Sequence, residues 1–346
     1  MKKFLKATVR GIQFVTVLTP TLEDDIAAKY WPHLTRDPAK ERCYDRETYF
    51  REALGDAVEI FGADFVPGMR RSALLLLKPD GLVAGKLRPT STFLQDHGFR
   101  VVLAKEVFLG GHRWREMWRY QLTTATLDRL AVNECFLTAG PSLLLLLRHD
   151  AEDTLPATVR LAGLKGSADP LSRAPGTLRG ALGQHNRVLS YVHAADEPAD
   201  LIRELGVLSD ALERRSVLAR LAADESGPQG EEELAQALWR HGGAGRDLCS
   251  SSALTRVTRQ VRSCAPGGPS ALGPWTRLLD QMESMAQGAR IDWRALRRDL
   301  EATKVQVDDW DLAALGADFT VHDEPEFSKT LGGPDLEAWS RAASAD

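Results

Sequence analysis

Short, solid runs of apolar residues stand near the centre of the chain and predict buried strands. Residues 72–77 and 142–147 read SALLLL and SLLLLL. A strand that is buried on both faces shows such a continuous apolar run instead of an alternation. Residues 99–109 and 187–192 are two further strand candidates. The solid runs are far too short to cross a bilayer, which takes about 20 apolar residues in a helix.

Helical periodicity separates these strand candidates. The predicted helices cover residues 87–97, 114–120, 124–136 and 155–161. Another helix is predicted to begin at Asp196 as its cap, with Pro198 in its first turn. Its expected apolar stripe consists of Leu201, Ile202, Leu205, Leu208 and Leu212. The order of elements predicts an α/β (α+β) fold, a ferredoxin-like split βαβ sandwich covered by helices.

Segments of a different character flank this pattern. Residues 1–70 are expected to form an N-terminal extension, with a helix over 46–61 and a turn over 65–68. Residues 213–346 carry amphipathic helices separated by loops rich in glycine and proline, which predicts a helical C-terminal domain. The central domain is therefore expected over residues 71–212.

Composition narrows the class of protein. The chain has 346 residues, 43% of them apolar and 27% charged, as is typical of a soluble globular protein. Its formal net charge of −4 gives no broad basic field for nucleic acid. The four cysteines are widely spaced, which favours reduced thiols over a disulfide framework or a zinc site. Arg10 and Gln13 interrupt the apolar start, so we predict a cytoplasmic protein and no membrane partner.

Two polar residues near predicted strand ends, and a glutamate in the helix that follows, could carry phosphate chemistry. Lys78 follows the first apolar run and precedes Pro-Asp-Gly, and a lysine there can neutralise phosphate oxygens. His193 follows the last strand candidate. A neutral imidazole can attack phosphorus when an acceptor holds its other nitrogen. Glu204 lies eleven residues further on, and the spacing alone leaves open whether it reaches back.

Two arginines flank a long loop over residues 163–180. Guanidinium groups such as those of Arg160 and Arg179 can clamp a polyphosphate and stabilise the charge of a moving phosphoryl group. Taken singly, each of these residues has a common structural role, such as a lysine at a strand end, a surface arginine or a buried histidine.

Together, and in this order, the motifs resemble those of the nucleoside diphosphate kinase family over residues 72–208. The matching motifs are KPDG with Lys78, TAGPSLLLLL, APGTLRG with Arg179, and VHAAD with His193. Arg160 matches the arginine that precedes the family's loop, and Glu204 the glutamate that orients its histidine. The resemblance implies a ferredoxin-like fold and a ping-pong transfer through a phosphohistidine at His193.

The same resemblance assigns the remaining roles. It implies Mg²⁺ with ATP or another nucleoside triphosphate, the metal being held mainly by the nucleotide phosphates. Lys78, Arg160 and Arg179 would contact phosphates. Tyr120 would correspond to the active-site tyrosine, and Ser190 stands where the family has an asparagine that binds the sugar.

The sequence departs from the family pattern in two places, immediately after the histidine and in the loop before Arg179. Ala194-Ala195 replace the Gly-Ser that follows the histidine, which removes a serine that helps to orient the glutamate. The loop over residues 163–175 is longer and has no obvious phosphate-binding threonine. Phosphate handling is therefore better preserved than nucleoside recognition. We expect the acceptor to be a nucleoside diphosphate or a specialised small molecule.

Alternative functions remain open at this stage. A catalytically weak or inactive nucleotide-binding module, regulatory or interacting with a partner, is the main alternative to an enzyme. Direct transfer to an acceptor without a phosphoenzyme is another. A homo-oligomer is possible, because the family forms oligomers.

Overall fold

A four-stranded antiparallel sheet lies at the centre of the molecule. The computed structural model describes residues 4–9, 12–17, 23–150, 155–223, 228–266 and 273–343. The strands of the sheet are β3 (Ser72–Leu77), β4 (Phe99–Val107), β5 (Ser142–His149) and β6 (Val192–Ala194). Their spatial order is β4-β5-β3-β6, so the first and third strands along the chain lie side by side in the middle. This order is that of the ferredoxin-like split βαβ fold, which confirms the predicted fold class.

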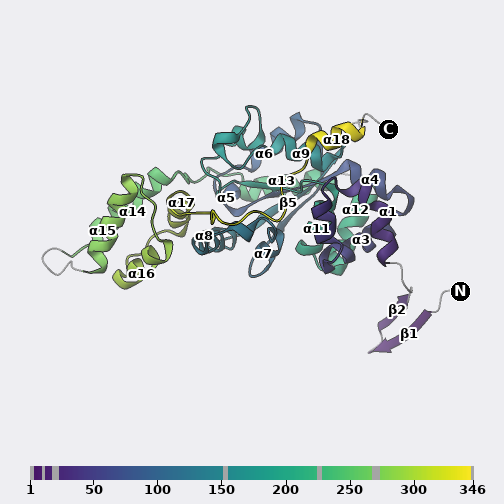
Figure 1. Cartoon of the computed structure of the whole chain (residues 1–346), viewed down its shortest axis with the longest axis horizontal. Coiled ribbons are helices and arrows are strands. Elements are labelled where there is room, and N and C mark those ends of the chain that lie inside the picture. Colours follow the sequence, from purple (N-terminus) through teal and green to yellow (C-terminus); the bar gives the residue numbers. More distant parts are fainter. Residues whose placement is uncertain are drawn as a thin grey trace.

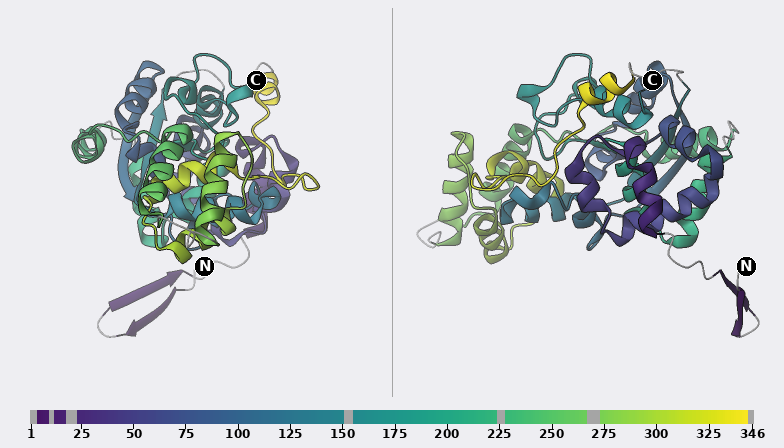
Figure 2. Two further views of the ribbon diagram at one scale, coloured as in Figure 1. Left: turned by 90° about the vertical axis from the view of Figure 1, so that its left-hand side faces the viewer. Right: turned by 45° about the vertical axis from the view of Figure 1, so that its right-hand side comes forward.

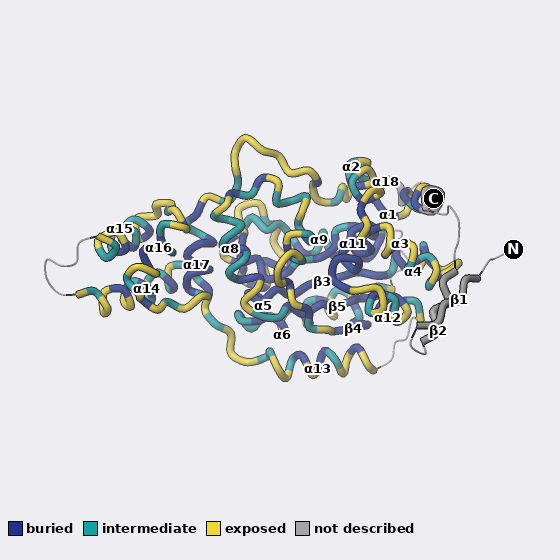
Figure 3. The backbone as a smooth tube through the Cα atoms, turned by 90° about the horizontal axis from the view of Figure 1, so that it is seen from below, coloured by how far each residue is buried: buried dark blue, intermediate teal, exposed yellow. Residues whose placement is uncertain are grey.

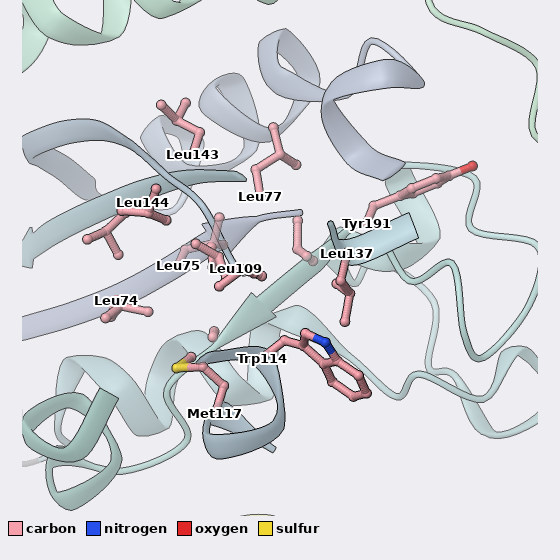
Figure 4. Close-up of a cluster of buried hydrophobic side chains, with 14 of the residues drawn as sticks. Leu74, Leu75, Leu77, Leu109, Trp114, Met117, Leu137, Leu143, Leu144 and Tyr191 are labelled. Atoms are coloured by element: carbon pink, nitrogen blue, oxygen red, sulfur yellow. The ribbon is translucent and has the colours of Figure 1, made fainter. Parts of the chain in front are cut away.

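The two leucine runs pair with each other to form the core of the sheet. In the β3–β5 pair, Ser72 faces Arg148 and Leu77 faces Leu143. The leucines of both strands are buried, and β3 is dark blue along its length in Figure 3. Figure 4 shows them beside Leu109, Trp114, Met117 and Leu137. Each buried leucine contributes about 1.5–3 kcal/mol, so the runs hold the sheet that positions the site.

Helices connect and cover these strands. They are α5 (Pro79–Val83), α6 (Leu87–Asp96), α7 (Arg113–Met117), α8 (Leu127–Leu137), α9 (Ala157–Lys165), α10 (Leu178–Ala181) and α11 (Pro198–Leu208), with short 3₁₀ turns at Leu122–Thr124 and Pro170–Ser172. The four predicted connecting helices are confirmed, with shifted ends. The predicted cap of α11 is wrong by one residue. Glu197 caps this helix in a capping box with Asp200, whereas Asp196 pairs with Lys165.

The strand predicted over residues 187–192 is largely wrong. Only Val192–Ala194 joins the sheet, although Val188, Leu189 and Tyr191 are buried. The Oδ1 atom of Asn186 accepts hydrogen bonds from the backbone N–H groups of Val188 and Leu189. A local side-chain partner of this kind gives the backbone an alternative to strand pairing.

The N-terminal segment adds a hairpin and a group of helices. Its elements are β1 (Phe4–Val9), β2 (Ile12–Val17), α1 (Glu23–Leu34), α2 (Pro38–Tyr44), α3 (Thr48–Phe61) and α4 (Phe65–Arg71), with a 3₁₀ turn at Gly62–Asp64. The predicted helix is confirmed as α3, and the turn predicted over residues 65–68 is wrong because these residues begin α4. Pro67 is tolerated there because the N–H groups of the first helical turn need no partner within the helix.

Close backbone contact and buried charges attach these N-terminal helices to α11. A Cβ atom at Gly206 would lie 2.3 Å from the carbonyl oxygen of Tyr49, so only glycine fits at this crossing. The Nζ atom of Lys40 lies 2.6 Å from Glu197 and 2.7 Å from Asp200, and all three side chains are buried. A buried ion pair of this kind is costly to break, so α11 is held firmly from this side.

The C-terminal segment is helical, as predicted. It consists of α12 (Ala211–Ala222), α13 (Gln229–His241), α14 (Ser250–Cys264), α15 (Pro274–Ala286), α16 (Trp293–Thr303), α17 (Asp309–Phe319) and α18 (Leu336–Ala343). Helices α14–α17 form a lobe at one end of the molecule (Figure 1). Leu212, placed in the apolar stripe of the preceding helix by the sequence, lies instead in α12 and is 83% exposed.

Helix α13 covers the outer edge of strand β4. The backbone N–H of Ala104 donates to Glu233 at 3.0 Å, and the Arg220 side chain donates to the carbonyl of Val102 at 2.6 Å. An uncovered edge strand offers unpaired backbone groups to other chains. The added helix therefore protects this edge of the sheet.

An extended segment over residues 320–335, here called the strap, returns from α17 across the central domain to α18 (Figure 2). Near its start, Thr126 N–H donates to the carbonyl of His322 at 3.1 Å. Further along, Thr330 N–H donates to the carbonyl of Tyr120 at 3.1 Å. Beyond it, the indole of Trp339 in α18 donates to Glu197 at 2.6 Å. The strap is thus fixed at both ends.

Candidate active site

A cavity of about 470 Å³ opens between α8, the end of α9, β6 and the strap. Among its lining residues six carry a positive charge: Lys78, Arg129, Lys165, Arg179, Arg187 and Lys329. Asp196 is the one acidic residue of the lining. Because the whole chain is acidic, this concentration of positive charge is local. It favours a ligand with several negative charges, such as a polyphosphate.

His193 lies at the wall of this cavity, on the edge strand β6. Its Nε2 atom is 2.7 Å from the Oε1 atom of Glu204 in α11. The sequence spacing left open whether Glu204 reaches His193, and the structure shows that the two side chains are in contact. With Nε2–H donating to the carboxylate, the lone pair of the neutral ring lies on Nδ1. The other oxygen of Glu204, Oε2, is buried without a hydrogen-bond partner.

Trp118 contacts the opposite side of the histidine ring, a contact that the sequence did not predict. Its indole Nε1–H donates to Nδ1 of His193 at 3.2 Å. The two rings are perpendicular, with an interplanar angle of 89° and centroids 5.4 Å apart. The histidine is therefore held at both nitrogens, by a carboxylate on one side and an indole on the other.

Two cations of the lining, Lys78 and Arg179, are buried. Lys78 follows β3, and its Nζ atom lies 3.2 Å from the carbonyl oxygen of Val188 and 3.5 Å from Asp80. Arg179 donates to the carbonyls of Gly166 at 2.8 Å and Val192 at 2.9 Å. Burial lowers the pKa of Lys78 and lowers that of Arg179 to about 10. Both charges are poorly solvated, so an anion in the cavity would stabilise them.

Lys165 is a cation of the site that the sequence did not single out. It lies at the end of α9, where its Nζ atom is 2.7 Å from Asp196 and 3.2 Å from the carbonyl oxygen of Ala194. Burial alone would raise the pKa of Asp196, but the charge of Lys165 and their hydrogen bond hold it below its usual value. The helix predicted here ended at residue 161, four residues before Lys165, so the sequence assigned this lysine no position on a helix.

The strap contributes to the cavity from the C-terminal side. Five lining residues come from it: Lys329, Leu331, Gly332, Gly333 and Pro334. Its Asp323 pairs with Arg187 at 3.1 Å and also with Arg129. The exposed Lys329 adds a positive charge at the opening. Part of the candidate site therefore lies outside the central domain.

Not every predicted site residue reaches the cavity. Ser190 lines it and is buried. Arg160 is not among the lining residues, whereas Ala162 and Lys165 of the same helix are. Two residues of α-helix turn the side-chain direction by about 200°, so Arg160 points away from the side that carries Ala162.

Tyr120 is also absent from the lining. Its hydroxyl donates to Glu47 at 3.1 Å, and its ring lies beside the guanidinium group of Arg203. Trp118, two residues earlier, faces His193 instead. The predicted counterpart of the active-site tyrosine therefore lies outside the cavity. The tertiary contact with α2 and α3 that determines its place is not visible in the local sequence.

Comparison with known proteins finds a family that is similar to the domain carrying this site. The family model described as "Nucleoside diphosphate kinase" matches residues 71–213. The nucleoside diphosphate kinase of Natronomonas pharaonis is 27% identical over 137 residues, covering 39% of this chain and 84% of that protein. That of Methanocorpusculum labreanum is 28% identical over 135 residues, covering 38% and 83%.

A solved structure gives a more distant comparison. It is that of a halophilic nucleoside diphosphate kinase from Halobacterium salinarum in complex with CDP, with 20% identity and a TM-score of 0.31. The match covers 47% of this chain and 84% of that one.

Within the described part of the chain, no helix is long and apolar enough to span a membrane.

Proposed function

Because residues 71–213 match the nucleoside diphosphate kinase family model, we propose that this protein transfers the γ-phosphoryl group of a nucleoside triphosphate through a phosphohistidine at His193. The observation that carries the proposal is the place of His193, bonded to Glu204 and open to a cavity lined by six cationic residues. The family match supports nucleotide phosphotransfer in general. The arrangement around His193 supports the covalent route.

The chemical step follows from the state of the two ring nitrogens. The lone pair on Nδ1 attacks the γ-phosphorus while the bond from that phosphorus to the β–γ bridging oxygen breaks, and the nucleoside diphosphate leaves with the electron pair. The proton stays on Nε2, where Glu204 stabilises the positive charge that the ring acquires. In the second half, an acceptor oxygen attacks the same phosphorus, and the N–P electrons return to Nδ1.

The cations of the cavity bind and orient the phosphates. Lys78 and Arg179 come from buried positions, and Lys165 and Lys329 add charge from α9 and the strap. Donors that are held in place before the reaction stabilise the charge of the transferring group at little cost of reorganisation. Arg160, assigned to the phosphates by the resemblance, is better regarded as a structural arginine of α9.

The site fits Mg²⁺ that is bound through the nucleotide. Among the described residues, no group of three or more His, Cys, Asp or Glu side chains could hold a metal ion. Asp196, the one acidic residue of the lining, is already paired with Lys165. Mg²⁺ on the phosphates of ATP or another nucleoside triphosphate supplies charge neutralisation when bound. The residues of the chain then contact the remaining phosphate oxygens.

The acceptor is a nucleoside diphosphate or a specialised small molecule. The strap and the apolar residues Leu122, Phe136, Leu137 and Leu331 line the cavity, so the non-phosphate part of a ligand contacts both the central domain and the C-terminal segment. This contribution from outside the family domain favours selection of the acceptor by the strap.

A second candidate, a catalytically weak or inactive nucleotide-binding module, is favoured by the buried Glu204 Oε2 atom that has no partner. Incubation with γ-labelled ATP and Mg²⁺ distinguishes the two. We expect acid-labile, alkali-stable label on the intact protein, lost in His193→Asn and retained in His33→Asn, a substitution at an exposed histidine of α1. Tight nucleotide binding without label would support the module. Phosphorylation of an acceptor by His193→Asn would indicate direct transfer.

A further inference from the structure

The nitrogen of His193 that would attack phosphorus is not free in this structure. Nε2 is engaged by Glu204, and Nδ1 accepts the indole N–H of Trp118 at 3.2 Å. A nitrogen whose lone pair accepts a hydrogen bond must lose that bond before it forms another bond along the same direction. The ring is thus oriented for reaction, but its reactive electron pair is occupied.

The position of Trp118 is determined outside the cavity. Arg203 donates to the carbonyls of Glu116 at 2.7 Å and Met117 at 3.3 Å, immediately before Trp118. The same guanidinium group binds Glu47, at the start of α3, at 2.9 Å. Arg203 is only 2% exposed. The backbone that carries the indole is therefore anchored by a buried ion pair between α11 and the N-terminal extension.

We propose that Trp118 is a specificity-determining residue that caps the nucleophilic nitrogen of His193 until a ligand with several phosphates displaces its indole N–H. A small uncharged electrophile cannot bind several of the cations that line the cavity at once, so it gains nothing that offsets loss of the indole hydrogen bond. A nucleoside triphosphate contacts several of those cations at once. The cap thus discriminates in favour of polyphosphates. This inference rests on the proposed function for its biological meaning, whereas the cap itself can be tested separately.

Diethyl pyrocarbonate tests the cap without any nucleotide. The unprotonated imidazole nitrogen attacks a carbonyl carbon of this reagent, an N–C bond forms, and ethyl carbonate leaves with the electron pair. In the full-length protein we would replace Trp118 by 3-benzothienylalanine, which keeps the bicyclic shape and has sulfur in place of the N–H group. Loss of one neutral hydrogen bond should make carbethoxylation of His193 about fivefold faster. Peptide mapping by mass spectrometry assigns the modified histidine.

Two further variants, Trp118→Phe and Trp114→Phe, are compared for the rate of carbethoxylation at His193. Trp118→Phe also lacks the donor and should react faster. Trp114 lies in α7, which ends immediately before Trp118. Its indole donates to Glu134 at 2.7 Å, so Trp114→Phe should leave the rate at His193 unchanged. Equal rates in wild type and in the benzothienylalanine protein would overturn the cap. So would acceleration by Trp114→Phe equal to that by Trp118→Phe, because the effect would then be general loosening of α7.

The phosphohistidine assay distinguishes failure of the cap from failure of the proposed function. If no protein takes label from ATP but the substituted protein still reacts faster with diethyl pyrocarbonate, the cap holds and the proposed function fails. If the wild type takes label and the carbethoxylation rates are equal, the function holds and the cap fails. Nitrogen NMR of His193 gives an independent check, since loss of the donor should shift the Nδ1 resonance and leave Nε2 bonded to Glu204.

Discussion

The Nε2 atom of His193 lies 2.7 Å from the Oε1 atom of Glu204, and the two residues come from different elements, an edge strand and the helix that follows it. A hydrogen bond to a carboxylate is stronger than one to a neutral group. Glu204→Gln keeps the shape and removes the charge. We expect phosphohistidine formation in a single turnover to slow by about 10–100-fold, the equivalent of a lost charged hydrogen bond.

The control for this prediction is Glu213→Gln, which removes a carboxylate that pairs with Lys105 on the surface. Its single-turnover rate should equal that of the wild type. An unchanged rate in Glu204→Gln would mean that the carboxylate does not assist the transfer.

The family resemblance implies a serine that helps to orient the glutamate, and this chain has Ala195, which offers no side-chain donor. Ala195 is fully buried, and Oε2 of Glu204 is buried and unbonded. A hydroxyl at position 195, where the related kinases have serine, should supply the missing donor. We expect Ala195→Ser to raise the rate of phosphohistidine formation about threefold, as one net hydrogen bond would. The matched control is Ala199→Ser, another buried alanine near the start of α11. An equal gain in that variant would contradict the explanation.

The ion pair of Asp196 and Lys165 should make the free energy of unfolding depend on pH. The pKa of Asp196 is lowered in the folded protein, so its contribution is present above the unfolded pKa of about 3.8 and is lost as the pH falls through the folded value. Asp196→Asn should lower the free energy of unfolding at pH 7 by about 1–2 kcal/mol. In urea titrations this difference should shrink below pH 4. The exposed Asp280→Asn should show neither effect.

Lys329 brings charge to the cavity from the strap. Because it is exposed, its attraction to a phosphate is partly screened. We expect Lys329→Ala to raise KM for the nucleoside triphosphate about two- to fivefold, with kcat almost unchanged and a smaller effect at high salt. Arg262→Ala, an exposed cation of α14, is the control. A fall in kcat with KM unchanged would show that the strap acts on the chemical step.

The sequence predicted secondary structure best where burial of apolar side chains alone determines it. The solid leucine runs predicted β3 and β5 because continuous apolar stretches have few structures other than a buried strand. The stretch before His193 also looked like a strand, but Asn186 binds its backbone and Tyr191 adopts a positive φ of 60°. Local hydrogen bonding there outweighs the apolar pattern. The division into three domains remains a prediction.

The order of motifs along the chain predicted part of the candidate site, but it did not predict side-chain directions or tertiary contacts. Lys78 and His193 could be placed at the ends of predicted strands, and the family resemblance added Arg179 to them. Arg160 was assigned to the site from the family resemblance, and Lys165 was given no role. The sequence did not show which side of this helix faces the cavity. Trp118 could not have been identified, because Arg203 and Glu47, both distant in sequence, determine its position.

The strap also bears on the order in which the protein is assembled during synthesis. The sheet, His193 and Glu204 are all present once the chain has been translated to about residue 208, yet Lys329 and Leu331 complete the cavity only later. The last fixed point, Trp339, binds Glu197 at the start of the helix that carries Glu204. A nascent chain that exposes the sheet domain would therefore hold its histidine in an open cavity. Selectivity for the ligand would arise only after the strap has been translated and bound.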